Sequence, residues 1–132
     1  MTADTLIERA RHVASLRRGL AAADELAADA TASGAPDAHV ADRTAEHDRQ
    51  REQLAAATDA LNDGLGDLQA PVLALVDAEE AVQIADEAVQ ASGMNVLARD
   101  RAVRTLSARE AARDEALAAL RSAVAVAPAV EG

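Results

Sequence analysis

The sequence predicts an all-α protein in which antiparallel helical hairpins form a four-helix bundle. Large apolar residues recur at spacings of three and four, which is typical of one helical face. Alanine, the strongest helix former, supplies most of the apolar half of the composition, and Phe, Trp and Tyr are absent. Clusters of Gly, Pro, Ser and Asn divide the chain into four long segments. We therefore expect one helical domain over 1–132, with helices over about 5–32, 36–62, 68–92 and 95–127.

The first segment, 5–32, has the sequence marks of a capped helix. Thr5 and Glu8 stand in capping-box spacing, and Ser33–Gly34 predicts the C-terminal end, with Gly34 as the cap. Gly19 lies inside the segment and costs about 1 kcal/mol relative to alanine. Either the helix tolerates this cost, or a partner helix passes close to Gly19.

The second segment, 36–62, starts with Pro36 in the first helical position and Asp37 at the positive end of the helix dipole. The connection from Gly34 is short, so we expect this helix to lie antiparallel to the first. That fold-back predicts ion pairs between the two helices. The expected neighbours are Arg17 and Arg18 with Glu52, Arg11 with Asp59, and Asp24 and Glu25 with Arg43 and Arg49.

The centre of the chain carries an apolar row interrupted by a turn or hinge at 62–71. The row repeats at seven-residue intervals and is broken only by His47; its members are Val40, Leu54, Leu61, Leu68, Leu75, Val82 and Val89. One interpretation is a turn, with Asp67 as N-cap and Pro71 in the first turn of the next helix. The other is one long kinked central helix, which would give an elongated rod. Proline inside a helix costs about 3 kcal/mol, so we expect the turn.

The third and fourth segments, 68–92 and 95–127, differ in charge. The third is acidic; the fourth starts at Asn95 as N-cap, carries six arginines and ends before Pro128, and 129–132 should be a frayed tail. Folding back at Gly93 predicts four ion pairs: Arg101 with Glu87, Arg109 with Glu79, Arg113 with Asp77, and Arg121 with Asp67. Where Glu110 and Arg113 interrupt the apolar spacing, either Ala112 and Ala116 turn inward or a polar layer faces the partner helix.

The turn contains two weak motif matches. Asp59, Asp63, Gly64 and Asp67 resemble the spacing of a calcium loop, but Leu61 and Ala70 occupy its third and twelfth positions. We interpret these residues as a capped interhelix turn. Gly64-Leu65-Gly66 is not a phosphate loop, because no strand precedes it and no Lys-Ser/Thr pair follows.

Histidines and carboxylates offer no catalytic or metal motif either. His12, His39 and His47 are scattered, and Glu8 with His12 lacks the second Glu-x-x-His of a di-metal bundle. We expect His47 at the boundary of the core, partly solvated, where a polar group can set helix register. The carboxylate cluster is interpreted as a solvated face opposite arginines, not as an acid–base pair; it comprises Asp77, Glu79, Glu80, Asp86 and Glu87. We predict no catalytic, cofactor-binding or metal-binding residues.

Charge and hydropathy restrict the partners. The net charge of −10 argues against direct nucleic-acid binding and against docking on anionic membranes. The sequence has no apolar run of signal-peptide or membrane-spanning length, and no cysteine for disulfides. We expect a chain that is cytoplasmic, or within a virion if it is encoded by a phage.

These observations favour a non-enzymatic helical structural or assembly protein. The core is thin, so we expect a homo-oligomer or larger protein assembly built through helix–helix contacts, with no small-molecule substrate. A phage virion or capsid-associated component is one concrete form, because Arg without Lys indicates a GC-rich host. The alternative is an acidic binding module (an inhibitor, antitoxin or nucleic-acid mimic) that occupies a basic site through its acidic run from Glu52 to Glu87.

Overall fold

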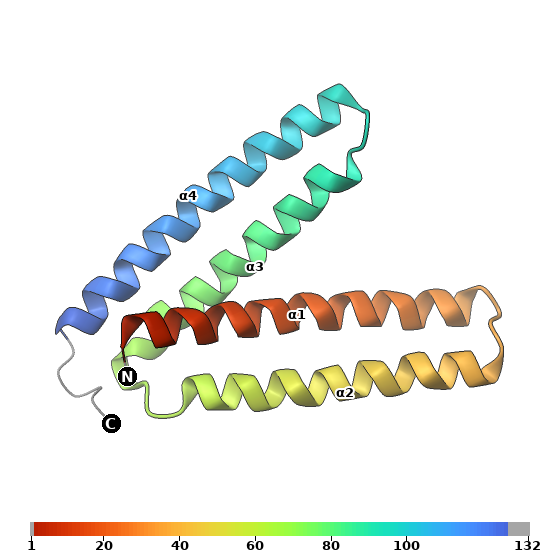
Figure 1. Ribbon diagram of the computed structural model, residues 1–132, viewed down its shortest axis with the longest axis horizontal. Coiled ribbons are helices and arrows are strands. Elements are labelled where there is room, and N and C mark those ends of the chain that lie inside the picture. The colour runs from red at the N-terminus through yellow and green to blue at the C-terminus, as the bar shows by residue number, and fades with distance from the viewer. Residues whose placement is uncertain (1, 127–132) are drawn as a thin grey trace.

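A computed structural model describes residues 2–126 and contains four α-helices and one short 3₁₀ turn over that range (Figure 1). The elements are α1 (Ala3–Ala32), α2 (Asp37–Asn62), η1 (Gly66–Leu68), α3 (Gln69–Ala91) and α4 (Val96–Val126). They run up-down-up-down as two antiparallel hairpins, α1–α2 and α3–α4, which confirms the predicted fold class. Pro128 and the predicted tail at 129–132 lie outside the described residues.

The two ends of α1 show how local hydrogen bonds set helix boundaries. The helix begins at Ala3 because Thr2, and not the predicted Thr5, is the N-cap: its hydroxyl oxygen accepts from the Thr5 amide at 3.2 Å. At the other end the Gly34 amide donates to the Thr31 carbonyl at 3.3 Å, and the following amide donates to the Ala30 carbonyl at 3.1 Å. This pattern closes the helix at Gly34, as expected.

The start of α4 agrees with the sequence signals, whereas Pro36 lies just before α2 and not in the first helical position predicted for it. Pro36 immediately precedes α2 and its carbonyl accepts from the Val40 amide at 3.1 Å. Asn95 caps α4, because its side-chain oxygen accepts from the Ala98 amide at 3.0 Å.

The segment between α2 and α3 is a turn, so the alternative of one long kinked central helix is wrong. Gly64 has a φ of +71°, a conformation that side-chain-bearing residues rarely adopt, and it separates the two helices. Pro71 is in the first turn of α3, as predicted. Asp67 is not the N-cap, because η1 passes directly into α3 and no side chain caps the junction. Leu65 and Leu68 anchor the turn by burying their side chains in the core.

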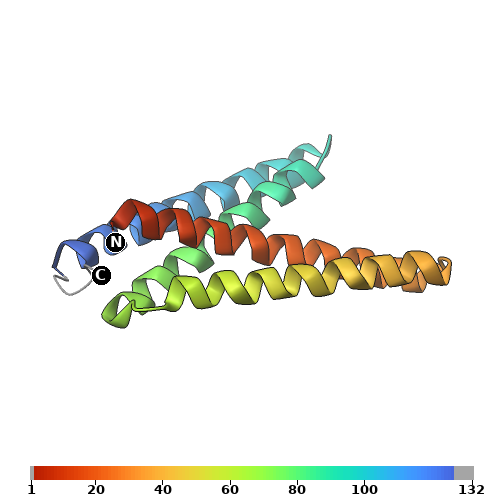
Figure 2. The same cartoon turned by 60° about the horizontal axis from the view of Figure 1, so that its bottom comes forward.

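The two hairpins meet at one end of the molecule and diverge at the other (Figures 1 and 2). α1 and α3 form the central pair, α2 packs against α1, and α4 packs against α3. We call the region where the hairpins meet the joined end; it comprises the start of α1, the end of α2, η1, the start of α3 and the end of α4. The distal ends are the diverging parts that lead to the turns at Gly34 and Gly93.

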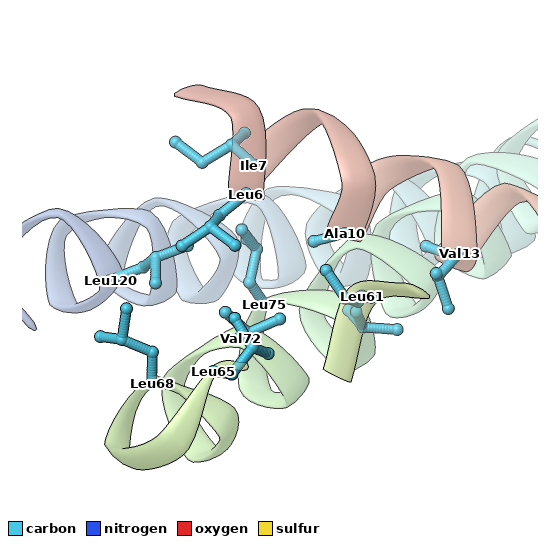
Figure 3. Packing of buried hydrophobic residues seen from close by; sticks show 12 residues of the cluster. Leu6, Ile7, Ala10, Val13, Leu61, Leu65, Leu68, Val72, Leu75 and Leu120 are labelled. Atoms are coloured by element: carbon cyan, nitrogen blue, oxygen red, sulfur yellow. The ribbon is translucent and has the colours of Figure 1, made fainter. Parts of the chain in front are cut away.

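Nearly all of the large buried side chains lie at the joined end (Figure 3). Those that are almost fully buried are Leu6, Val13, Leu61, Leu68, Val72, Leu75, Val76 and Leu120. Burying such a side chain contributes roughly 1.5–3 kcal/mol. Toward the distal ends the buried apolar residues are alanines, namely Ala23, Ala30 and Ala85, which offer far less area. The core is therefore concentrated at one end of the bundle.

The central apolar row shows the same gradient. Leu61, Leu68 and Leu75 are buried at the joined end, whereas the row's outer members are half-buried; these are Val40, Leu54, Val82 and Val89. On α1, a Cβ atom added at Gly19 would lie 3.0 Å from Oε1 of Gln50 on α2. Only the end of a flexible side chain of α2 approaches Gly19, so the helix tolerates this glycine and no close approach of the α2 backbone requires it.

The predicted ion pairs are wrong in both hairpins, although the fold-back predicted for the first hairpin is confirmed: Gly19 lies opposite Gln50, and Asp24 lies opposite His47. Arg11, Arg17 and Arg18 of α1 contact carboxylates of α3 and not those of α2. Correspondingly, Asp77, Glu79 and Glu87 take their arginines from α1 and not from α4, and Arg121 of α4 lies 3.5 Å from Asp4 of α1. The prediction paired only helices that are consecutive in the chain. In the structure α1 and α3 start side by side at the joined end and run in the same general direction, so the charged faces of their first parts meet.

Candidate functional site

A row of ion pairs joins α1 to α3 where the two hairpins meet. Arg11 Nε lies 3.1 Å from Glu79 Oε1. Arg17 Nη1 lies 2.8 Å from Asp77 Oδ1 and 3.3 Å from Glu80 Oε2. Arg18 Nη2 lies 2.5 Å from Glu87 Oε2. We call these contacts the α1–α3 ion-pair row.

Glu79 is the one charged residue of the described chain that is buried, with 7% of its surface exposed. Its partner Arg11 keeps half of its side chain in solvent, so this pair is only partly desolvated. Pairs at such positions contribute roughly 0–1 kcal/mol each. The row therefore orients the two hairpins more than it stabilises them. Sequence reasoning missed the burial of Glu79, although it follows Leu75 and Val76 by four and three residues and so shares their buried face.

The predicted carboxylate cluster faces arginines, as expected, but the arginines come from α1. Asp77, Glu80 and Glu87 are engaged in the α1–α3 ion-pair row. Asp86 accepts a hydrogen bond from Gln90 Nε2 at 2.9 Å, within α3. Most of the cluster thus contributes to the interface between α1 and α3.

His47 occupies the boundary position predicted for it. Its side chain is 21% exposed, and its Nε2 lies 3.5 Å from Asp24 Oδ1 on α1, while Nδ1 lies 3.6 Å from Asp48 Oδ1. His12 and His39 are exposed and lie on different helices. His47 therefore supplies a polar contact across the α1–α2 hairpin.

The acidic residues of the central turn do not converge. Asp59, Asp63 and Asp67 are exposed, and Leu65 between them is buried in the core. Within residues 2–126, no group of three or more His, Asp or Glu side chains is placed to hold a metal ion. Over the same range, no helix combines the length and the hydropathy that a membrane span requires.

Both interpretations of the middle of α4 hold in part. Glu110 and Arg113 are half-buried and Ala112 is exposed, whereas Ala116 turns inward and packs against the core. The Nε atom of Arg113 is buried without a hydrogen-bond partner, and its Nη2 lies 3.5 Å from Asp114 Oδ1. The polar layer of Glu110 and Arg113 separates the well-packed end of α4 from its exposed end.

A second feature of α4 is a stripe of residues at seven-residue spacing, which places them on one helical face. We call it the α4 stripe; it comprises Val96, Val103, Glu110, Leu117 and Val124. Leu117 and Val124 pack against the core at the joined end. Val103 is 42% exposed and Val96 is 77% exposed. The stripe is therefore covered at one end and uncovered at the other.

The geometry of the described residues thus consists of contacts between helices: a core at the joined end, an ion-pair row between α1 and α3, and an uncovered continuation along α4. Comparisons with protein-family models, with curated proteins and with solved structures found no match to this chain.

Proposed function

We propose that this chain is a non-enzymatic helical structural or assembly protein that acts through helix–helix contacts in a homo-oligomer or larger assembly. A virion or capsid-associated protein of a phage with a GC-rich host is the concrete form that the composition suggests. In either form, the function lies in the surfaces that the helices present to other helices.

One observation carries the proposal: large apolar side chains are exposed on the distal ends. Leu26, Ile84, Val96, Leu97 and Val103 are each at least 42% exposed, and Met94 at the α3–α4 turn is 99% exposed. Single exposed apolar residues are ordinary on protein surfaces. Here, however, Val96 and Val103 continue the face of α4 that packs against the core at the joined end. Covering such faces is the usual thermodynamic reason for helical chains to associate.

Self-association is tested by measuring the molar mass of the purified chain in solution. Sedimentation velocity and light scattering across a series from low to high micromolar concentrations should give a mass above that of one chain, with the larger species gaining population as concentration rises. A protein that stays monomeric throughout, and that remains monomeric with the proteins encoded beside it, would contradict the proposal.

The alternative function, an acidic binding module, has less support. Four carboxylates of the acidic run, Asp77, Glu79, Glu80 and Glu87, contact arginines of α1, so that part of the run is already partnered. An acidic mimic would bind a basic protein with an affinity that falls steeply as salt is added. Association through apolar helix faces is expected to depend much less on salt.

A further inference from the structure

The uncovered half of the α4 stripe is a continuation of the hydrophobic core. At the joined end, Leu117 and Val124 of the stripe pack against the cluster that contains Leu6 of α1. Farther along α4 the α1–α2 hairpin has diverged, as Figure 1 shows, and Val103 and Val96 have lost their cover. Where the α1–α2 hairpin has diverged from α4, a helix from another molecule could cover this part of the stripe.

The charges beside the uncovered half indicate what that helix should be. Residues 96–109 carry four arginines and one carboxylate, for a net charge of +3. Residues 20–50, which form the distal end of the α1–α2 hairpin, carry seven carboxylates and two arginines, for a net charge of −5. Opposite charge favours the approach of these two surfaces and disfavours each with itself. The acidic distal end of this same chain is thus a matched partner for the basic end of α4.

The distal end of the α1–α2 hairpin also has room for a helix. A groove open to solvent runs between α1 and α2, with a floor of small residues and exposed Leu26, and polar side chains on the α2 side that include two carboxylates and one arginine. It is lined by Gly19, Ala22, Ala23 and Leu26 of α1 and by His39, Asp42, Arg43, Glu46 and Gln50 of α2. Small residues let helix backbones approach closely, and Leu26 supplies apolar area to meet the valines of α4.

We infer that two copies of this chain associate by docking the Val96–Val103 face of α4 into the groove between α1 and α2 of the other copy. This inference rests on the proposed function and names the surface through which the copies would meet. In a two-fold dimer the contact is made twice. Repetition allows two modest faces to approach the roughly 1,200–2,000 Å² that stable interfaces bury.

The first experiment places a charge in the apolar face. Val103→Asp should raise the dimer dissociation constant at least about tenfold in sedimentation equilibrium, because it buries an unpaired carboxylate at the interface. Val126→Asp is the matched control, since Val126 is also exposed on α4 but lies at the other end of the helix and off the stripe. Its dissociation constant should equal that of the natural chain. Circular dichroism confirms that both variants remain helical.

The second experiment reverses one charge on each surface, so that it does not depend on a core substitution. Arg99→Glu and Asp42→Arg should each weaken the homodimer about threefold to tenfold. When the two variants are mixed, the heterodimer has one contact with reversed charges and one natural contact, so association should recover to within about threefold of the natural chain. Failure to recover would show that these two residues do not face each other.

A crosslink locates the contact directly. The chain contains no cysteine, so a mixture of Leu26→Cys and Val103→Cys proteins can form a mixed disulfide only between copies. A Leu26→Cys and Val126→Cys mixture is the control. If the natural chain self-associates but Val103→Asp has no effect and the Leu26–Val103 crosslink does not exceed its control, the docking inference is overturned while the proposed function stands. If the natural chain is strictly monomeric on its own, the docking inference is overturned, and the proposed function falls with it only if the chain also fails to join the proteins encoded beside it.

Discussion

The joined end and the distal ends of this molecule are built from the same helices but by different means. At the joined end, leucines and valines from all four helices converge on one cluster, so α2 and α4 contribute Leu61 and Leu120 to the core made by α1 and α3. At the distal ends each hairpin is a pair of helices held by alanines, such as Ala23 and Ala85, with large apolar residues left in solvent. Each helix thus runs from the hydrophobic core at the joined end to a distal end where large apolar side chains are exposed to solvent.

The largest expected effect comes from removing a side chain at the joined end. Leu75→Ala should lower the free energy of unfolding by about 2–5 kcal/mol, because Leu75 is fully buried and leaves a cavity. Leu106→Ala, at a half-buried leucine toward the distal end of α4, should cost only about 1 kcal/mol. Denaturant unfolding of both variants measures the difference. Equal losses would mean that the core extends along the whole of the α3–α4 hairpin.

An alanine substitution in the turn at each end tests the same comparison, because it introduces the same backbone strain at the joined end and at a distal end. Gly64 and Gly93 both have positive φ and open space around the Cβ position, so alanine at either costs about 1–2 kcal/mol of conformational strain. Gly64→Ala should lower global stability by that amount, because the turn carries Leu65 into the core. Gly93→Ala should lower it by less than half as much, since the distal turn can open locally to escape the strain. Hydrogen exchange by amides near each turn separates local from global opening.

The ion-pair row between the two regions should have a moderate effect. Glu79→Gln removes the charge opposite Arg11 and should cost about 1 kcal/mol, a value kept small because Arg11 is half-exposed. The cost should shrink in high salt, and solution scattering should report a changed angle between the hairpins. Glu115→Gln, at an exposed position on α4, is the control and should leave both stability and scattering unchanged. A larger loss at Glu115 would contradict this account.

The smallest expected effect is a gain in stability. Gly19→Ala should stabilise the chain by about 0.5–1 kcal/mol through better helix propensity. The new methyl group meets only the end of the Gln50 side chain, which can shift by a few tenths of an ångström. Thermal unfolding should therefore show a slightly raised midpoint. A lowered midpoint would indicate that α1 and α2 are tightly packed around Gly19. That result would contradict the difference in packing between the joined end and the distal ends.

The elements of the fold could be predicted from local signals, because helix ends depend on nearby residues. Asn95 capping α4, Gly34 closing α1 and Pro71 in the first turn of α3 all act through hydrogen bonds within a few residues. The Thr5 cap failed for the same local reason, since Thr2 offers the same hydroxyl three residues earlier.

The packing of the hairpins could not be predicted, because it depends on which non-consecutive helices meet. The charge pattern was compatible with Glu79 facing either Arg109 or Arg11, and only the three-dimensional arrangement selects Arg11. The exposure of the α4 face could not be predicted for the same reason. Val103 and Leu117 share a stripe in the sequence, yet Val103 is exposed and Leu117 packs against the core at the joined end, where the two hairpins meet.

The divergence of the hairpins also has a mechanical consequence. α1 has 30 residues, so it is about 45 Å long, and the contacts that orient it against α3 lie in its first two-thirds. A rotation of about 5° at the joined end would carry the Gly34 turn through about 4 Å, by simple leverage on a helix of that length. A small repacking around Leu6 and Leu75 is therefore amplified into a displacement of about 4 Å at the tip of the α1–α2 hairpin.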